Sequence, residues 1–216
     1  MLKLPFNTRL ISMLNAEVTA KHNKRLQLLL KKANLKVIAN IHDIDYSAKR
    51  ELNVDVMMAL TSLDWLKQHL NIAFTGPSGV GKTWLACALG HEACLRGYPV
   101  AFKKVGVLLE ELNSAKLTGT FHKVITQLSK YAVLILDDWA ADPYTRQQQS
   151  DLFELIDERH MKCSTIITAQ VPIVEWHDAF PNKNIADSLL DRLINTSYQI
   201  ELSGESMRRR KKLSEL

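Results

Sequence analysis

The sequence predicts an α/β protein in which five short strands form a mostly parallel sheet between helices. From Ile72 onward, short apolar runs alternate with helical patterns, as they do in consecutive βαβ units. The first of these runs leads directly into a glycine-rich segment, residues 76–83, that matches GxxxxGK[ST] in full. The third run ends in two consecutive acids, Asp137 and Asp138. Together these observations predict a P-loop NTPase core.

Ahead of that core the pattern is helical. Apolar residues recur at helical spacing between residues 8 and 35, with lysines and arginines at the intervening positions. Residues 37–57 are expected to form a connector, and residues 54–70 a helix that ends before Asn71. The sequence therefore predicts a short basic helical region in front of the sheet.

The core elements follow in a regular order. Short, continuously apolar strands suit a parallel sheet that is covered by helices on both faces. The expected strands are residues 72–75, 99–103, 132–136, 164–168 and 198–202. The expected helices are residues 81–96, two or more within 106–130, then 146–160 and 184–194.

Composition narrows the class of protein. The chain has 216 residues, 28 Lys and Arg, 23 Asp and Glu, and a formal net charge of +5, which describes one globular unit rather than a disordered chain. No apolar run has the length of a membrane span, and the first residues lack the pattern of a signal peptide. The odd number of cysteines, without CxxC spacing, favours reduced thiols. We therefore expect a cytoplasmic protein without membrane partners.

The glycine-rich segment carries the strongest chemical signal. Its glycines allow backbone N–H groups to form a nest for phosphate oxygens, and the helix that follows adds the positive end of its dipole. We expect Lys82 to reach the β- and γ-phosphates of ATP and the hydroxyl of Thr83 to bind Mg²⁺. The predicted nucleotide-binding residues are Gly76, Pro77, Ser78, Gly79, Val80, Gly81, Lys82 and Thr83.

The strand that ends in Asp137 and Asp138 supplies the second part of such a site. Asp137 is the expected metal-side acid, and Asp138 is placed to polarise an attacking water. The predicted strand at 99–103 lies between the P-loop and this acid strand in the chain. That order favours ATP hydrolases with an additional strand over nucleotide kinases. The alternative is that the two acids simply begin a turn.

Two further residues are candidates for catalysis. Gln170 follows the strand at 164–168, where a polar side chain could contact the γ-phosphate or the attacking water, although a polar strand end is an equally good interpretation. Arg192 lies in an otherwise apolar helix end. An Asp-Arg pair of this kind is more often a surface ion pair, so the pair by itself does not assign a catalytic role to Arg192.

The charge is distributed unevenly along the chain, because both of its ends are basic. Residues 1–36 carry 8 basic and 1 acidic residue, residues 37–207 carry 15 and 21, and residues 208–216 carry 5 and 1. A run such as residues 208–212, Arg-Arg-Arg-Lys-Lys, is most often a solvated tail. With a second basic cluster at residues 21–36 and an ATPase between them, binding to a nucleic acid backbone becomes the better interpretation.

Several short segments of the chain form a recognisable set. They are the P-loop followed by Trp-Leu-Ala and these further segments: Asp43-Ile44-Asp45-Tyr46, Asp64-Trp65, Leu136-Asp137-Asp138-Trp139, Trp176-His177, Ile185-Ala186-Asp187, Leu190-Asp191-Arg192-Leu193, Ile200-Glu201-Leu202 and Gly204-Glu205-Ser206-Met207-Arg208. With these segments the sequence resembles the IstB family, the ATP-binding helper subunits of insertion-sequence transposases, which is similar to DnaC-type helicase loaders of the AAA+ class. The resemblance covers about residue 9 to the end.

The resemblance implies an AAA+ core without a large lid, ATP-dependent assembly on duplex DNA, and a partner transposase. It implies a homo-oligomer with ATP at the subunit interfaces, in which Arg192 acts on the ATP of the adjacent subunit. Two departures matter. The N-terminal helical domain of the family normally extends further ahead of Arg9, and the family more often has Ser where this chain has Ala169.

The expected organisation is a basic helical region and connector at 1–57, an ATPase core at 58–207 and a basic tail at 208–216. The leading functional hypothesis is a DNA-binding ATPase that serves transposition. The alternative is a helicase loader that uses ATP as a switch and binds a replicative helicase. A small-molecule kinase is disfavoured because the sequence shows neither an acceptor site nor a mobile lid with arginines.

Overall fold

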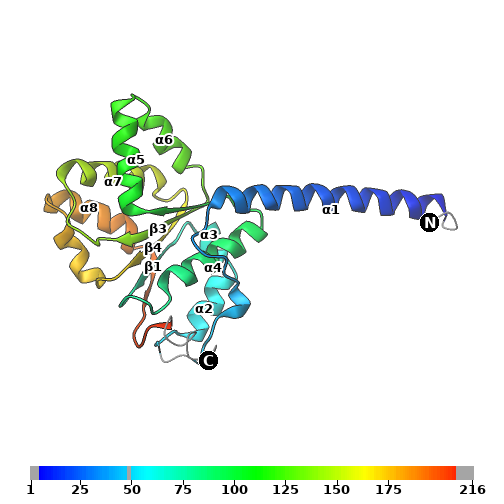
Figure 1. The fold of residues 1–216 in the computed structure, drawn as a ribbon, viewed down its shortest axis with the longest axis horizontal. Coiled ribbons are helices and arrows are strands. Elements are labelled where there is room, and N and C mark those ends of the chain that lie inside the picture. The colour runs from blue at the N-terminus through cyan, green and yellow to red at the C-terminus, as the bar shows by residue number, and fades with distance from the viewer. Residues whose placement is uncertain (1–4, 48–49, 208–216) are drawn as a thin grey trace, which may run out of the picture.

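The computed structural model describes residues 5–47 and 50–207, and its centre is a five-stranded sheet (Figure 1). The strand order is β2-β3-β4-β1-β5, and all the described strand pairs are parallel. The strands are β1 (Asn71–Thr75), β2 (Val100–Lys104), β3 (Val133–Trp139), β4 (Ser164–Ala169) and β5 (Ser197–Glu201). The predicted five-stranded α/β fold is confirmed, with each strand within two residues of its expected position at either end except β3, which extends three residues further.

Helices cover both faces of the sheet. Along β3 the buried side chains alternate, so that Val133 and Ile135 pack into one core cluster and Leu134 and Leu136 into the other. The first face carries α2 (Val54–Thr61), α3 (Asp64–Lys67), α4 (Lys82–Leu95) and the base of α1 (Phe6–Ala33). The second carries α5 (Val105–Leu117), α6 (Phe121–Leu128), α7 (Arg146–Arg159) and α8 (Lys183–Ile194). Two 3₁₀ helices, Ile41–Asp43 and Ile173–Ala179, lie in connecting segments.

The single helix expected at 54–70 is two helices in the structure. Leu63 adopts a left-handed conformation, with φ of 62°, and separates α2 from α3. The break turns Trp65 into the core, where its indole N–H donates to the carbonyl of Leu60 at 2.9 Å. Burial of the tryptophan therefore outweighs the helical propensity of the segment.

Helix α1 extends away from the body of the molecule (Figure 1). Its 28 residues correspond to a length of about 42 Å. Only its C-terminal end packs against the core, through Leu26, Leu29, Leu30 and Ala33, and it ends at Asn34, which has φ of 48°. The expected basic helix is present, but most of its apolar residues are exposed. None of the helices in the described ranges has the length and apolar character needed to cross a membrane.

Candidate nucleotide-binding site

The P-loop connects β1 to α4, at the carboxyl end of a central strand of the sheet. Gly76 has φ of 131° and Gly79 has φ of 90°, a region of backbone space that side chains other than glycine rarely occupy. A Cβ atom on Gly76 would lie 1.9 Å from the carbonyl oxygen of Leu202. The glycines of the motif are thus required both by the backbone turn and by close packing.

Lys82 is the first residue of α4 and is buried. Its ammonium group donates hydrogen bonds to the carbonyl oxygens of Gly76 at 2.6 Å and Pro77 at 2.8 Å, so it lies over the loop rather than pointing into solvent. A loop closed around a cation at a helix N-terminus suits phosphate oxygens. The arrangement therefore fits the triphosphate of a nucleotide.

Asp137 is the centre of the second part of the site. It is fully buried, and its Oδ1 accepts hydrogen bonds of 2.6 Å from the hydroxyls of both Thr83 and Thr168. Its Oδ2 lies 2.8 Å from the ammonium nitrogen of Lys36. Burial by itself raises the pKa of the Asp137 carboxyl, but hydrogen bonds from Lys36, Thr168 and Thr83 outweigh burial and leave that pKa below its usual value. The carboxyl group is therefore ionised.

The residues present fit a magnesium ion. Mg²⁺ prefers hard oxygen ligands and is commonly held by one or two carboxylate or hydroxyl groups together with substrate phosphates. The adjacent Thr83 hydroxyl and Asp137 carboxylate supply such oxygens beside the P-loop. The predicted metal-binding pair is thus brought together by the fold.

Asp138 occupies an unusual backbone position. Its φ is 62°, and the register of β3 against β4 shifts between Leu136 and Trp139. The shift turns the two consecutive carboxylates to different surroundings, so that Asp137 is buried while Asp138 borders the cavity and pairs with Lys104 at 3.0 Å. A left-handed aspartate at the end of a strand is a strained feature of the kind found at functional sites.

A cavity of about 640 Å³ joins these parts. Such a volume lies within the range of small-ligand sites. Gln170 borders the cavity at the end of β4, beside Thr168, so both polar residues of this strand end face the site. The lining comprises Lys36, Val37, Ile38, Asp43, Asp45, Arg50, Ser78, Gly79, Gly81, Lys82, Thr83, Trp84, Asp138, Thr168, Ala169, Gln170 and Met207.

Arg192 does not border this cavity in its own chain. It lies on α8, where its guanidinium group pairs with Asp157 at 2.9 Å and stacks 5.0 Å from the ring centre of Phe153. Within one subunit, therefore, the predicted catalytic residues fall into two groups, with Lys82, Asp138 and Gln170 at the cavity and Arg192 away from it.

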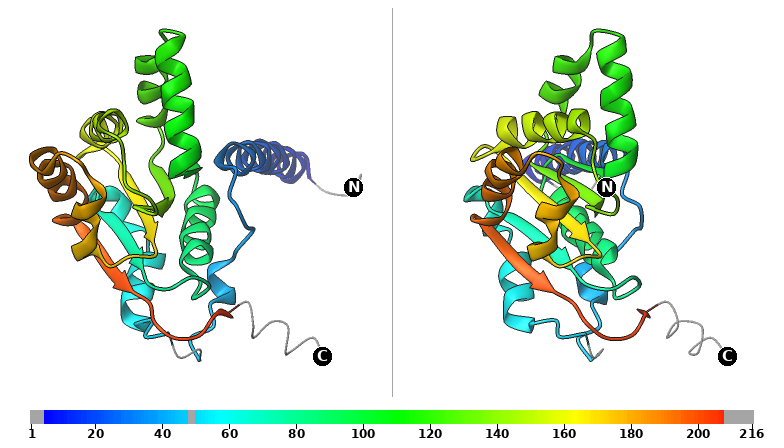
Figure 2. Two further views of the ribbon diagram at one scale, coloured as in Figure 1. Left: turned by 60° about the vertical axis from the view of Figure 1, so that its left-hand side comes forward. Right: turned by 90° about the vertical axis from the view of Figure 1, so that its left-hand side faces the viewer.

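Two segments outside the predicted site also contact the P-loop. Arg50, in the connector, is 3% exposed, and it donates to the carbonyl oxygens of Val80 at 3.4 Å and Asp45 at 3.0 Å. The segment after β5, red in Figure 2, donates the N–H of Met207 to the carbonyl of Gly79 at 2.9 Å. The Gly-Glu-Ser-Met signature noted in the sequence thus packs against the phosphate loop.

The sequence does not indicate that Thr168, Lys36, Lys104 or Arg50 belongs to the site. For Thr168 the available signal is its position at the end of the strand that precedes Gln170. Nothing local marks the other three, because each contacts the site only through packing of distant segments.

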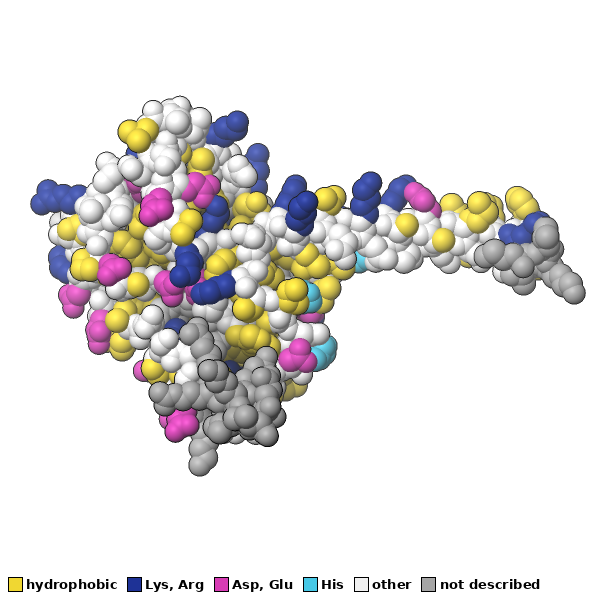
Figure 3. Space-filling model, in the orientation of Figure 1, with side chains coloured by type: hydrophobic (Ala, Val, Ile, Leu, Met, Phe, Trp, Pro, Cys, Tyr) yellow, Lys and Arg dark blue, Asp and Glu magenta, His cyan; other side chains and the backbone are white. Residues whose placement is uncertain are grey.

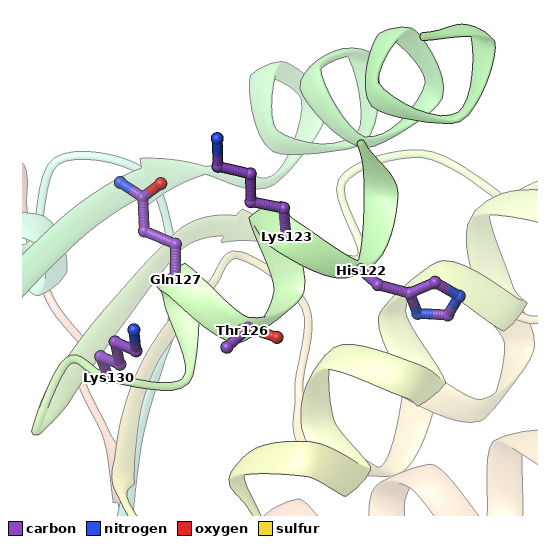
Figure 4. Close-up of a pocket in the computed structure, with 5 residues that line it drawn as sticks. All are labelled: His122, Lys123, Thr126, Gln127 and Lys130. Atoms are coloured by element: carbon purple, nitrogen blue, oxygen red, sulfur yellow. The ribbon is translucent and has the colours of Figure 1, made fainter. Parts of the chain in front are cut away.

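A second hollow, of about 490 Å³, lies along α6 (Figure 4). Its lining comes from that helix and the turn after it: His122, Lys123, Thr126, Gln127 and Lys130. These side chains point in different directions instead of converging (Figure 4). The hollow therefore lacks the convergent polar groups that characterise the nucleotide cavity.

Comparison with known proteins shows the family of the chain. The family model described as "IstB-like ATP binding protein" matches residues 2–215. A putative insertion sequence ATP-binding protein of Sinorhizobium fredii (strain NBRC 101917 / NGR234), y4pL, is 40% identical over 197 residues, covering 91% of this chain and 80% of that protein. A putative ATP-binding protein of insertion sequence IS1162 from Pseudomonas fluorescens is 43% identical over 170 residues, covering 78% and 74%.

Solved structures share the fold at low sequence identity. AMPPCP-bound DnaA from Aquifex aeolicus superposes with a TM-score of 0.68 at 20% identity, over 84% of this chain and 56% of that chain. The DnaC helicase loader gives 0.62 at 18% identity, over 76% and 96%. The predicted AAA+ type P-loop fold is thus confirmed, and the resemblance noted in the sequence is confirmed as well. With a family model that matches nearly the whole chain, the protein belongs to the IstB-like ATP-binding proteins.

Proposed function

We propose that this protein is an ATP-hydrolysing, DNA-binding helper that assembles on duplex target DNA and assists a partner transposase. The observation that carries the proposal is the contact between Thr83 of the P-loop and the buried carboxylate of Asp137, with Lys82, Thr83 and Asp138 bordering one cavity, in a family of insertion-sequence ATP-binding proteins. Nucleotide binding alone would not need Asp138 at the cavity in addition to the metal-side acid Asp137.

The chain's own residues suit hydrolysis. Lys82 can exchange its two carbonyl contacts for phosphate oxygens, and the amides of residues 76–83 can hold the rest of the triphosphate. Mg²⁺ held by Thr83 and Asp137 would neutralise charge on the β- and γ-phosphates. Asp138 then accepts a hydrogen bond from the attacking water and orients it. Gln170 borders the same cavity and contacts the γ-phosphate end of the nucleotide.

Arg192 supports an oligomeric arrangement. Its side chain is 27% exposed, and its guanidinium group is held in place by Asp157 and Phe153 rather than by groups at the cavity of its own chain. An arginine fixed on the surface in this way can be presented to the ATP of a neighbouring subunit, where it would stabilise charge that develops on the transferring phosphoryl group. We therefore propose that ATP lies at interfaces between copies of this chain.

Helix α1 supports contact with duplex DNA. It carries six exposed cations, Arg9, Lys21, Lys24, Arg25, Lys31 and Lys32, against one acid, Glu17. In the view of Figure 3, basic side chains follow one edge of the projecting helix. A long basic helix extending from an ATPase core can reach phosphates on both sides of a groove. The second predicted basic segment, residues 208–212, lies outside the described residues.

We keep the division into a basic helical region with connector at 1–57, a core at 58–207 and a tail at 208–216 as a proposal. The connector contributes to the cavity through residues such as Val37, Asp45 and Arg50. We therefore expect the core without its connector to bind nucleotide less tightly than the full chain.

The test is the rate of phosphate release with and without duplex DNA, at several salt concentrations. We expect duplex DNA to stimulate hydrolysis and the stimulation to fall as salt rises, because phosphate contacts release counterions. Lys82→Ala should abolish hydrolysis by weakening nucleotide binding. A rate that neither DNA nor salt changes would contradict the proposal. Stimulation only by single-stranded DNA, together with capture of a replicative helicase, would favour the helicase loader instead.

A further inference from the structure

Lys36 brings a cation to the metal-binding carboxylate from a distant part of the chain. It lies two residues beyond the left-handed residue Asn34 that ends α1. Its ammonium nitrogen is 2.8 Å from Oδ2 of Asp137, and the two residues are 101 positions apart in sequence. The side chain of Lys36 is 39% exposed, whereas that of Asp137 is 0% exposed. The lysine therefore reaches from the surface to a buried anion.

Among the residues that the structure describes, Lys36 is the cation that forms an ion pair with this anion. Oδ1 of Asp137 accepts hydrogen bonds from the hydroxyls of Thr83 and Thr168, which are neutral. A buried carboxylate needs a compensating positive charge as well as hydrogen bonds. An Mg²⁺ ion held by Thr83 and Asp137 would bind the same carboxylate group that Lys36 contacts, and two cations on one carboxylate group repel each other. Lys36 and a bound metal ion therefore compete for Asp137.

We propose that Lys36 is the resident counter-ion of Asp137, and that Mg²⁺ arriving with nucleotide must displace its ammonium group. This inference rests on the proposed nucleotide site, and it adds a residue and a coupling that the family assignment does not contain. Lys36 thereby raises the Mg²⁺ concentration that is needed for binding of Mg²⁺ and nucleotide. It also makes the states with and without bound Mg²⁺ and nucleotide differ at the base of α1.

The connection to α1 is short. On one side of Lys36, Ala33 is fully buried and Leu35 packs against α4, so close that a Cβ on Gly90 would lie 3.3 Å from the Leu35 side chain. On the other side, Val37 and Ile38 border the cavity and Ala39 is buried. Displacement of Lys36 is therefore confined to the few residues between two anchors, and it acts directly on the end of the basic helix.

The experiment compares wild type with Lys36→Met, which removes the charge and keeps an unbranched side chain. Lys36→Arg keeps the charge, and Lys123→Met, at an exposed position of α6, serves as a matched control. A fluorescent, non-hydrolysable ATP analogue at fixed concentration is titrated with Mg²⁺, and anisotropy reports its binding. We expect Lys36→Met to reach half-maximal binding at a Mg²⁺ concentration about three- to tenfold lower than wild type, with Lys36→Arg and Lys123→Met close to wild type. An unchanged or higher midpoint for Lys36→Met would overturn the proposal.

A second measurement needs no nucleotide, so it separates failure of this proposal from failure of the proposed function. Thermal unfolding is recorded in EDTA and in excess Mg²⁺ alone. In Lys36→Met the carboxylate of Asp137 lacks its counter-ion, so we expect Mg²⁺ to raise the melting temperature more than in wild type. Equal Mg²⁺ effects in both proteins would count against a shared site on Asp137.

Hydrogen exchange tests the coupling to α1. We expect amides of residues 34–40 in wild type to exchange faster when Mg²⁺ and the analogue are added. In Lys36→Met the same amides should exchange fast before any addition. If the exchange rate of residues 34–40 changes neither on addition of Mg²⁺ and the analogue nor in Lys36→Met, Lys36 is not coupled to the helix.

Discussion

Arg159 shows how a single buried cation can hold several elements together. It is 1% exposed, and its guanidinium donates to the carbonyl oxygens of Leu128 at 2.7 Å, Tyr131 at 2.9 Å and Ser164 at 2.5 Å. Burial lowers the pKa of Arg159 to about 10, which still leaves it charged at neutral pH. The residue thus connects the ends of α6 and α7 to the start of β4.

Replacement of Arg159 should therefore be costly. We expect Arg159→Met to lower the free energy of unfolding by about 3 kcal/mol, because several buried carbonyl groups lose their donor. Urea unfolding followed by circular dichroism measures the change. Arg146→Met, at the exposed start of α7, is the control and should stay within about 0.5 kcal/mol of wild type. Equal effects of the two substitutions would contradict the structural role of Arg159.

At Asp138 the prediction concerns catalysis rather than stability. Asparagine tolerates the left-handed backbone at least as well as aspartate, so Asp138→Asn should fold normally. It should bind nucleotide with wild-type affinity and lose about 10²- to 10⁴-fold in turnover, because the amide cannot take a proton from water. Binding of a fluorescent nucleotide and single-turnover hydrolysis separate the two effects. Normal turnover in Asp138→Asn would show that Asp138 is not the water-polarising acid. The control is Asp142→Asn, at an exposed position.

At the scale of elements, the phosphate loop is held from three sides. The β1 strand and α4 enclose it, Arg50 contacts it from the connector, and Met207 contacts it from the segment after β5. A Cβ on Gly79 would lie 2.3 Å from the hydroxyl of Ser206. The segment after β5 therefore packs directly against the phosphate loop and helps to hold its conformation.

The proposed contact of helix α1 with duplex DNA is tested by removing positive charges from the helix. Lys24 and Lys31 are exposed and lie seven residues apart, which places them on one face of the helix. If each contacts a phosphate, the double variant Lys24→Ala/Lys31→Ala should reduce the slope of log affinity against log salt for duplex DNA by about 2. Fluorescence anisotropy across a salt series measures this slope. The control pair Lys67→Ala/Lys162→Ala should leave it unchanged, and a slope unaffected by the α1 pair would remove α1 from the interface.

At the scale of the whole molecule, the separation of Arg192 from the cavity predicts complementation between subunits. Arg192→Ala and Asp138→Asn should each be nearly inactive alone. In an equal mixture, about one quarter of the interfaces would pair an intact Asp138 with an intact Arg192, so hydrolysis should recover to about that fraction of wild type. Phosphate release from mixtures at constant total protein measures the recovery. Activity that stays at the level of the separate variants would contradict a shared site.

The sequence by itself determined the elements and the motif chemistry. The five strands were predictable because each is a short apolar run, and the P-loop and the Asp137–Asp138 pair were predictable because their residues are contiguous. Where prediction failed, as at the break between α2 and α3, the burial of Trp65 overrode local helical propensity.

Only the tertiary structure decided which distant residues complete the site. Lys36 reaches Asp137 across 101 positions, Arg50 reaches the P-loop across 30, and Arg192 stays outside the cavity of its own chain. The opposite surroundings of Asp137 and Asp138 depend on a register shift between two strands. Local periodicity encodes which side chains face a core, whereas contacts between remote segments depend on how those cores pack together.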